Sequence, residues 1–218
     1  MARIVFDLDG TLIDSAPDIH GIANALLARE GRAPISLDQT RDFIGNGASV
    51  FVARMRRASN IPDAQHDRLL GDFVASYDDA VTLTQPYPGV VEALQNLKAE
   101  GLRLGICTNK PIRPTYAVLR HLGLDRWFDT VWGGDSLPVH KPDPEPLHAA
   151  FDALGDGVQI YVGDSEVDAE TAKRADIPFL LFTEGYRKTA VAEIPHRTRF
   201  SDFADLPGIV RTLLRNAA

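Results

Sequence analysis

Two aspartates separated by a single residue follow the first apolar run of the chain, in the stretch Ile4-Val-Phe-Asp-Leu-Asp-Gly-Thr-Leu-Ile-Asp14. Residues 4–6 are typical of a strand that is buried on both faces. Asp is a poor strand residue and Asp-Gly indicates a turn, so the strand is expected to end near Asp7. Because burying an unpaired carboxylate is costly, Asp7 and Asp9 are predicted to be paired, metal-bound or functional. The plain alternative is a strand that finishes in an acidic turn.

Polar residues suited to binding a phosphate follow three later apolar runs. Thr108 and Asn109 follow the run 102–107, Lys141 comes after the run 130–132, and Asp164 and Asp168 follow the run 159–163. The four-residue spacing turns the last two carboxylates towards one side of the helix expected there. Taken singly, each residue also has a plain reading as a strand terminus, a solvated lysine or a helix-capping acid. Their recurrence at successive strand ends favours one shared site.

The charges of these groups predict a bound cation. Asp7, Asp9, Asp164 and Asp168, when ionised, exceed the single positive charge of Lys141 by three. Two like charges 4 Å apart repel by about 4 kcal/mol at an effective dielectric near 20, so a phosphate dianion would be excluded from such a pocket. Mg²⁺ favours oxygen ligands and phosphates, and its binding would leave a single negative charge in excess.

The segment after the first strand reads as an all-helical insertion. Ser15-Ala-Pro-Asp18 and Ser36-Leu-Asp-Gln39 are helix-start patterns, and Gly45-Asn-Gly47 is a break between helices. Apolar residues then recur at helical spacing as far as Tyr77. A helical block in this position predicts a small cap domain over residues 15–82.

From Tyr87 onwards, helical stripes alternate with short apolar runs. With the first strand, the runs 102–107, 130–132, 159–163 and 179–182 predict five strands. This alternation is typical of an α/β fold with a doubly wound parallel sheet, whose ligands bind at the carboxyl ends of the strands. Residues 1–14 and 83–218 are therefore expected to form the catalytic core, with the helical cap inserted after its first strand.

Bulk composition excludes several classes of partner. The 218 residues are 44% hydrophobic and 24% charged, with a net charge of −7, which disfavours nucleic acid and anionic membranes as partners. Cys107 is the only cysteine, so no internal disulfide is expected. Met1-Ala-Arg leads directly into the first apolar run, and no run approaches membrane-spanning length. These features predict a cytoplasmic protein, and the sequence leaves open whether it is a monomer or a homodimer.

The string Asp7-Leu-Asp-Gly-Thr-Leu resembles the first motif of the haloacid dehalogenase (HAD) superfamily of phosphotransferases, and the later groups match its remaining motifs in order. The resemblance implies a HAD-like Rossmannoid core in which Asp7 is the nucleophile that forms aspartyl-phosphate and Asp9 is the general acid and base. It also implies Mg²⁺ held by Asp7, the backbone carbonyl of Asp9 and Asp164, with Asp168 close behind. Thr108 and Lys141 would stabilise charge on the transferring phosphoryl group.

Within the superfamily, the whole chain most closely resembles the bacterial phosphoglycolate phosphatases, through the stretches 43–47, 107–111 and 132–144. This resemblance implies 2-phosphoglycolate, a small phosphate ester, as the substrate. Asn109 is expected to bind phosphate, and Asn46 and Gly47 are expected near the mouth of the site. Arg41 would suit the substrate carboxylate through a bidentate pair, or is simply a surface residue.

Other activities stay open at this point. A β-phosphoglucomutase-like mutase, a pyrophosphatase or a broad sugar-phosphate phosphatase would share the core motifs, and a non-catalytic phosphate-sensing or phospho-accepting module is the alternative from another class. Phosphonoacetaldehyde hydrolases need a cap lysine, but residues 15–84 contain none. Haloacid dehalogenases lack an acid at the position of Asp9 and work without metal.

Overall fold

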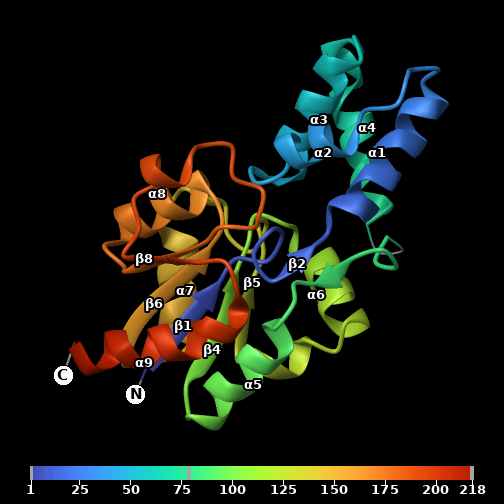
Figure 1. The fold of residues 1–218 in the computed structure, drawn as a ribbon. Coiled ribbons are helices and arrows are strands. Elements are labelled where there is room, and N and C mark those ends of the chain that lie inside the picture. The colour runs from blue at the N-terminus through green and yellow to red at the C-terminus, as the bar shows by residue number, and fades with distance from the viewer. Residues whose placement is uncertain (1, 78–79, 217–218) are drawn as a thin grey trace.

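A six-stranded sheet, in which every neighbouring pair is parallel, forms the centre of the computed structural model, which describes residues 2–77 and 80–216 (Figure 1). Its spatial order is β5 (Thr130–Trp132), β4 (Arg103–Cys107), β1 (Ala2–Phe6), β6 (Val158–Gly163), β7 (Phe179–Phe182) and β8 (Thr198–Phe200). The five predicted strands and their parallel arrangement are confirmed. The edge strand β8 was not predicted, because three residues with one buried side chain give no recognisable apolar run.

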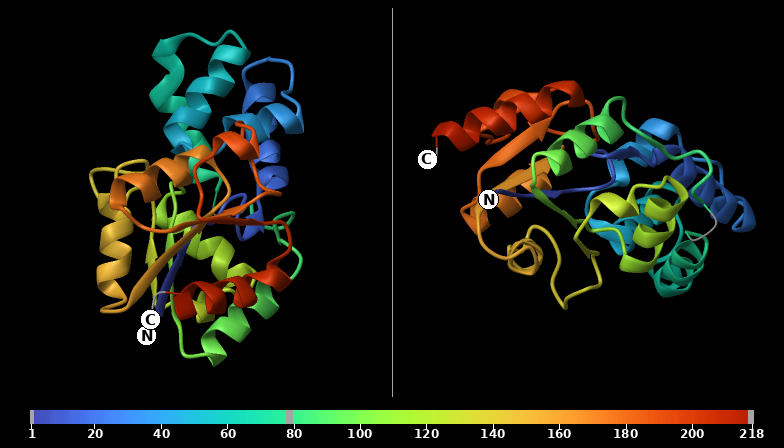
Figure 2. Two further views of the ribbon diagram at one scale, coloured as in Figure 1. Left: turned by 60° about the vertical axis from the view of Figure 1, so that its left-hand side comes forward. Right: turned by 90° about the horizontal axis from the view of Figure 1, so that it is seen from below.

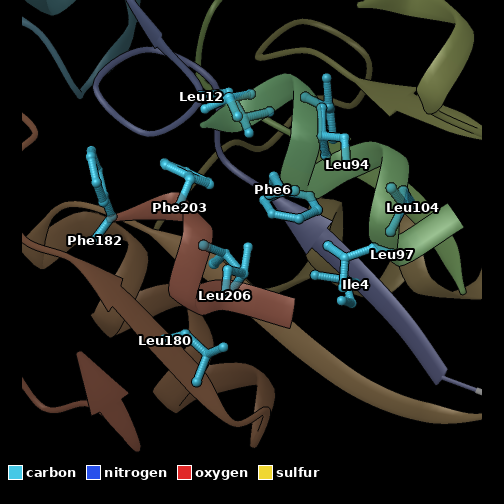
Figure 3. Close-up of a cluster of buried hydrophobic side chains, with 14 of the residues drawn as sticks. Ile4, Phe6, Leu12, Leu94, Leu97, Leu104, Leu180, Phe182, Phe203 and Leu206 are labelled. Atoms are coloured by element: carbon cyan, nitrogen blue, oxygen red, sulfur yellow. The ribbon is translucent and has the colours of Figure 1, made fainter. Parts of the chain in front are cut away.

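Helices cover both faces of this sheet (Figure 2). They are α5 (Val90–Ala99), α6 (Ile112–His121), α7 (Glu145–Ala153), α8 (Glu166–Ala175) and α9 (Leu206–Asn216). Successive side chains of β1 point to opposite faces. Ile4 and Phe6 therefore join the apolar cluster under α5, α6 and α9 (Figure 3), whereas Val5 joins the cluster under α7 and α8. All five residues of β1 are buried, as expected for a central parallel strand.

Four helices between β1 and the rest of the sheet form a separate group, called here the helical group (Figure 1). They are α1 (Ala16–Arg29), α2 (Leu37–Phe43), α3 (Gly47–Ala58) and α4 (His66–Ala75). Their apolar stripes share a cluster of their own, which includes Leu26, Phe51 and Phe73. The Ser36–Gln39 capping box is present, but Ser15 makes no side-chain capping bond to α1 and donates to Asp9 instead.

Short 3₁₀ helices complete the described chain at 63–65, 125–127, 191–193 and 203–205. Among residues 2–77 and 80–216, no helix combines the length and the apolar character that crossing a bilayer requires.

The carboxylate of Asp18 ties the start of the helical group to the returning chain. It is buried in the first turn of α1, and its Oδ2 accepts hydrogen bonds from the Leu83 amide (3.0 Å), the Thr84 amide (2.7 Å) and the Thr84 hydroxyl (2.7 Å). Nearby, β2 (Ile13–Asp14) pairs with β3 (Gln85–Pro86) in an antiparallel ribbon. The two chain crossings between sheet and helical group are thereby held side by side.

We predict that Asp18→Ala lowers the free energy of unfolding by about 2–4 kcal/mol, because it removes three charge-assisted hydrogen bonds and leaves buried donors at Thr84 unpaired. Urea denaturation followed by circular dichroism measures the change. The control is Asp152→Ala, which removes an exposed aspartate of α7 and should stay within about 0.5 kcal/mol. Equal effects of the two substitutions would contradict the role given to Asp18.

Candidate active site

The predicted site residues meet at the carboxyl edge of the sheet. Asp7, Thr108 and Asp164 directly follow β1, β4 and β6, and β1 lies between the other two strands. Each of the three side chains is at least nine-tenths buried. Adjacent parallel strands end at one edge, so the sheet order alone places these residues next to one another.

Lys141 joins the groups of this edge. Its Nζ donates to Asp7 Oδ1 (2.7 Å), Asp168 Oδ1 (2.7 Å) and the hydroxyl of Tyr161 (2.9 Å), and its side chain is 3% exposed. Burial alone would lower the pKa of Lys141, but the charges of Asp168 and Asp7 raise it above its ordinary value. Lys141 is therefore a permanent cation with all three donors engaged.

Tyr161 was not predicted as a site residue, because it stands inside the apolar run of β6. Its hydroxyl donates to Asp168 Oδ1 (2.7 Å), which Lys141 also contacts. A buried tyrosine needs a partner for its hydroxyl, and this requirement is the only signal the sequence carries for its place here. Tyr161 fixes the orientation of the Asp168 carboxylate.

Asp7 and Asp164 have raised pKa values, whereas the pKa of Asp168 is lowered. Burial raises the pKa of Asp7 to about 7 against the opposing effect of Lys141. Burial, together with the charges of Asp168 and Asp7, also raises the pKa of Asp164 well above its usual range. For Asp168 burial acts in the same direction, but the ammonium of Lys141 and the hydroxyls around it hold the pKa low.

Asp7, Asp164 and Asp168, called here the acidic triad, fit a divalent cation. Each offers a carboxylate oxygen, and these atoms lie within 4.8 Å of one another in a buried position. Hard cations such as Mg²⁺ and Ca²⁺ take oxygen ligands of this kind. Burial, the main cause of the raised pKa values of Asp7 and Asp164, disfavours their ionised forms, and a bound cation would offset that cost. The side chain of Asp9 lies outside this triad.

Gly10 permits the close approach that orients Asp164. A Cβ at this position would lie 2.7 Å from Asp164 Oδ2, and the backbone φ of +89° is in the region that favours glycine. The carboxylate itself is held by the Thr11 hydroxyl (2.8 Å) and by the amide of Tyr186 (2.6 Å).

Asp9 has a different environment from Asp7. Its Oδ1 accepts from the Ser15 hydroxyl (2.5 Å) and from Lys110 Nζ (3.2 Å), which also lies 3.5 Å from Oδ2. The Lys110 ammonium lies 4.3 Å from the centre of the Tyr77 ring. Neither Ser15 nor Lys110 was predicted as a site residue. For Lys110, the available signal is its position two residues after Thr108, at the same strand end.

Two small cavities flank Asp7 and Asp9. One, called here the Lys110 cavity, has a volume of about 30 Å³, and its lining includes Asp7, Asp9, Ile19, Gly47, Ala48, Phe51, Tyr77, Thr108, Asn109 and Lys110. The other has about 20 Å³, and its lining includes Asp7, Asp9, Lys141, Asp164, Asp168, Tyr186 and Lys188. A wider surface groove of about 900 Å³ lies beside α9, and it contains none of the predicted site residues.

The loop between α2 and α3 lies over both cavities. Asn109 Nδ2 donates to the Gly45 carbonyl (3.0 Å) and to the Lys141 carbonyl (2.9 Å), so it joins this loop to the core. Lys188 Nζ donates to the Ile44 carbonyl (3.1 Å). Within the described residues, Asn109 Oδ1 is buried without a hydrogen-bond partner, which leaves an acceptor for a ligand or water.

Of the residues predicted near the mouth, only Gly47 lines a cavity. Among the described residues, Arg41 and Asn46 do not contribute to either lining. Arg41 lies 3.6 Å from both Asp14 and Asp38 instead, and Asn46 Oδ1 accepts from Arg54 (3.0 Å). Local partners therefore occupy both side chains in this structure.

The chain is similar to known proteins over nearly its whole length. The profile of the haloacid dehalogenase-like hydrolases matches residues 4–182. Phosphoglycolate phosphatase from Cereibacter sphaeroides is 51% identical over 98% of this chain and 100% of its own length. The Rhodobacter capsulatus phosphoglycolate phosphatase is 46% identical over 95% of each chain. The crystal structure of a predicted phosphoglycolate phosphatase from Haemophilus somnus 129PT superimposes with a TM-score of 0.90, at 31% identity, over 95% of this chain and 97% of the other.

The fold, the site and these matches define a hydrolase, and the chain belongs to the haloacid dehalogenase-like hydrolase family. Its relatives further identify it as a phosphatase.

We predict that Mg²⁺ binds the acidic triad and that its affinity increases as the pH is raised from 6 to 8. Metal ligands must be ionised, and burial raises the pKa of Asp7 to about 7. Each proton displaced on binding gives roughly a tenfold gain per pH unit. Calorimetric titration across this range measures the gain, and Asp164→Asn is the control that should abolish binding. A pH-independent affinity would contradict the ligand set.

Proposed function

We propose that this chain is a Mg²⁺-dependent phosphomonoester hydrolase that works through an aspartyl-phosphate on Asp7 and converts 2-phosphoglycolate to glycolate and phosphate. One observation carries the chemical part of the proposal. Two carboxylates two residues apart face one cavity, but Asp7 belongs to the acidic triad while Asp9 binds Ser15 and Lys110 outside it. Different environments for two neighbouring acids are the usual basis for giving them different roles.

The reaction proceeds as two displacements at phosphorus. In the first, an Asp7 oxygen forms a bond to phosphorus while the bond to the ester oxygen breaks, and Asp9 gives that oxygen a proton. In the second, Asp9 takes a proton from water as the water oxygen attacks the aspartyl-phosphate, which releases phosphate and restores Asp7. Asp9 therefore ends the cycle in the protonation state in which it began.

The remaining groups stabilise charge on the phosphoryl group in flight. Lys141, whose donors are engaged, would act through its charge beside Asp7, and the Thr108 hydroxyl and backbone amides near Leu8 and Asn109 would act as hydrogen-bond donors. Asp7, Asp164 and the backbone carbonyl of Asp9, with Asp168 close behind, would hold Mg²⁺, which supplies neutralising charge to the phosphate oxygens when it is bound.

Residues 15–82 serve in this proposal as a cap over a core formed by residues 1–14 and 83–218. The separate apolar cluster of the helical group supports this division. So does the size of the two cavities, because about 30 and 20 Å³ leave little room for a substrate unless the cap moves aside. Closure would then exclude water from the reaction.

The substrate assignment rests on the relatives named as phosphoglycolate phosphatases. A hexose phosphate has a far larger leaving group than glycolate, so closure of the cap over Asp9 would favour the smaller ester.

Asp7→Asn is expected to reduce kcat to less than roughly a hundredth of the wild-type value, because an amide oxygen is a poor nucleophile towards phosphorus. Phosphate release from 2-phosphoglycolate measures the loss, and circular dichroism shows whether the variant is folded. Asp152→Asn, on the exposed face of α7, is the matched control and should leave kcat unchanged. A folded Asp7→Asn enzyme with near-normal turnover would require another nucleophile.

The highest kcat/KM in a panel of phosphate esters is expected for 2-phosphoglycolate. It should exceed the values for hexose phosphates and pyrophosphate by at least about tenfold, or roughly 1.4 kcal/mol of transition-state preference. Initial rates with Mg²⁺ in excess give the comparison. Equal or better turnover of a hexose phosphate would overturn the substrate and leave the phosphatase chemistry in place.

A further inference from the structure

Lys110 is a buried cation that has no role in the two displacements described above. Its side chain is 4% exposed, and its ammonium contacts both oxygens of Asp9 at 3.2 and 3.5 Å. The ring of Tyr77 lies beneath it at 4.3 Å. Ile19 and Phe51 line the same cavity together with Asp9. A buried lysine needs an anionic partner, and among the described residues Asp9 is that partner; the ammonium has three donors, so it can bind a second anion as well.

Lys110 lies close to where the leaving group of the substrate would be, because it contacts the proton donor Asp9. The proton donor Asp9 must lie within hydrogen-bond reach of the ester oxygen that departs. In 2-phosphoglycolate, one methylene group separates that oxygen from the carboxylate carbon. A carboxylate on so short a tether falls beside Asp9, and Lys110 is the described cation that already contacts Asp9.

We propose that Lys110 binds the carboxylate of the substrate and thereby selects phosphate esters whose leaving group carries an anion one carbon from the ester oxygen. The proposal rests on the proposed function and names the residue that determines its specificity. A lysine has three donors, so Lys110 contacts Asp9 and the carboxylate together. In this role it is a specificity-determining residue and forms no covalent bond.

Helix α3 adds positive potential to the same cavity. Gly47 and Ala48, in its first turn, line the same cavity as Lys110. The N-cap residue Asn46 makes no side-chain capping bond, so the first amides of α3 keep their donors directed beyond the helix end. The N-terminal end of a twelve-residue helix favours an anion in front of it.

Other cations near the site are less well placed. Lys141 donates to Asp7, Asp168 and Tyr161, which uses its three donors. The side chain of Arg41 is 40% exposed beside Asp14 and Asp38. Lys188 lines the other cavity, on the side of the acidic triad, and donates to the Ile44 carbonyl. A substrate carboxylate in the cavity that holds Lys110 therefore meets Lys110.

The test compares two esters that differ in the carboxylate. We expect Lys110→Met and Lys110→Gln to lower kcat/KM for 2-phosphoglycolate by about 30-fold or more, the usual cost of removing one partner of a buried ion pair. For ethyl phosphate, which lacks the carboxylate, the expected loss is about threefold or less. Lys110→Arg keeps the charge and should retain most of the preference. Arg41→Met is the matched control and should leave the ratio between the esters unchanged.

An equal loss of kcat/KM for both esters would mean that Lys110 acts only through Asp9, and it would overturn the proposal.

A binding measurement separates recognition from turnover. In an Asp7→Asn background, calorimetry should show that Lys110→Gln weakens the binding of 2-phosphoglycolate and leaves the binding of inorganic phosphate unchanged. A wild-type chain that hydrolyses no ester would overturn the proposed function, whereas this binding comparison would still decide the role of Lys110. Equal affinity for 2-phosphoglycolate with and without Lys110 would overturn the role proposed for Lys110.

Discussion

The ammonium of Lys141 is the interaction on which the active edge of the sheet depends. Asp7 and Asp168 are both buried, and one unpaired carboxylate there would cost several kcal/mol. Lys141 contacts both, and Tyr161 completes the set from within β6. These contacts join strand ends β1 and β6 to the loop that carries Lys141. Burial nevertheless keeps the pKa values of Asp7 and Asp164 raised, and the carboxylate oxygens of Asp7, Asp164 and Asp168 lie close enough together to hold a cation.

The short distance in sequence between Asp7 and Asp9 hides a large difference in environment. The strand ends at Phe6, and the turn through Gly10 places Asp164 against the backbone while Asp9 faces Ser15 and Lys110. Two acids that shared one environment would repel each other and titrate as a pair. Separate partners are what the proposed mechanism needs, in which one carboxylate would hold the metal ion and the other would transfer protons. The arrangement of the turn is therefore as important to the chemistry as the acids themselves.

The sequence predicted those parts of the fold and site whose physical signals are local. Apolar runs located five strands, and parallel order at one edge brought Asp7, Thr108 and Asp164 together. It did not predict β8 because an edge strand of three residues buries too little to leave a pattern. Tyr161 was missed because it stands inside an apolar run and looks like core, and Lys110 because, apart from its place after Thr108, nothing in its local sequence distinguishes it from any other loop lysine. Lys110 and Asp9 are 101 residues apart in the sequence. A contact over such a distance depends on tertiary packing, which no local pattern encodes.

The distribution of cations bears on how the site selects its substrate. Residues 15–84 contain no lysine, and two arginines near the α2–α3 loop, Arg41 and Arg54, are held by local partners. Lys110 and Lys141 both lie in loops that follow strands of the sheet. A carboxylate bound by Lys110 is then recognised by the same rigid edge that positions Asp7 and Asp9, and its placement does not depend on an exact fit of the helical group. What the helical group contributes is the apolar wall of Ile19 and Phe51, which excludes water and so strengthens the ion pairs at that edge.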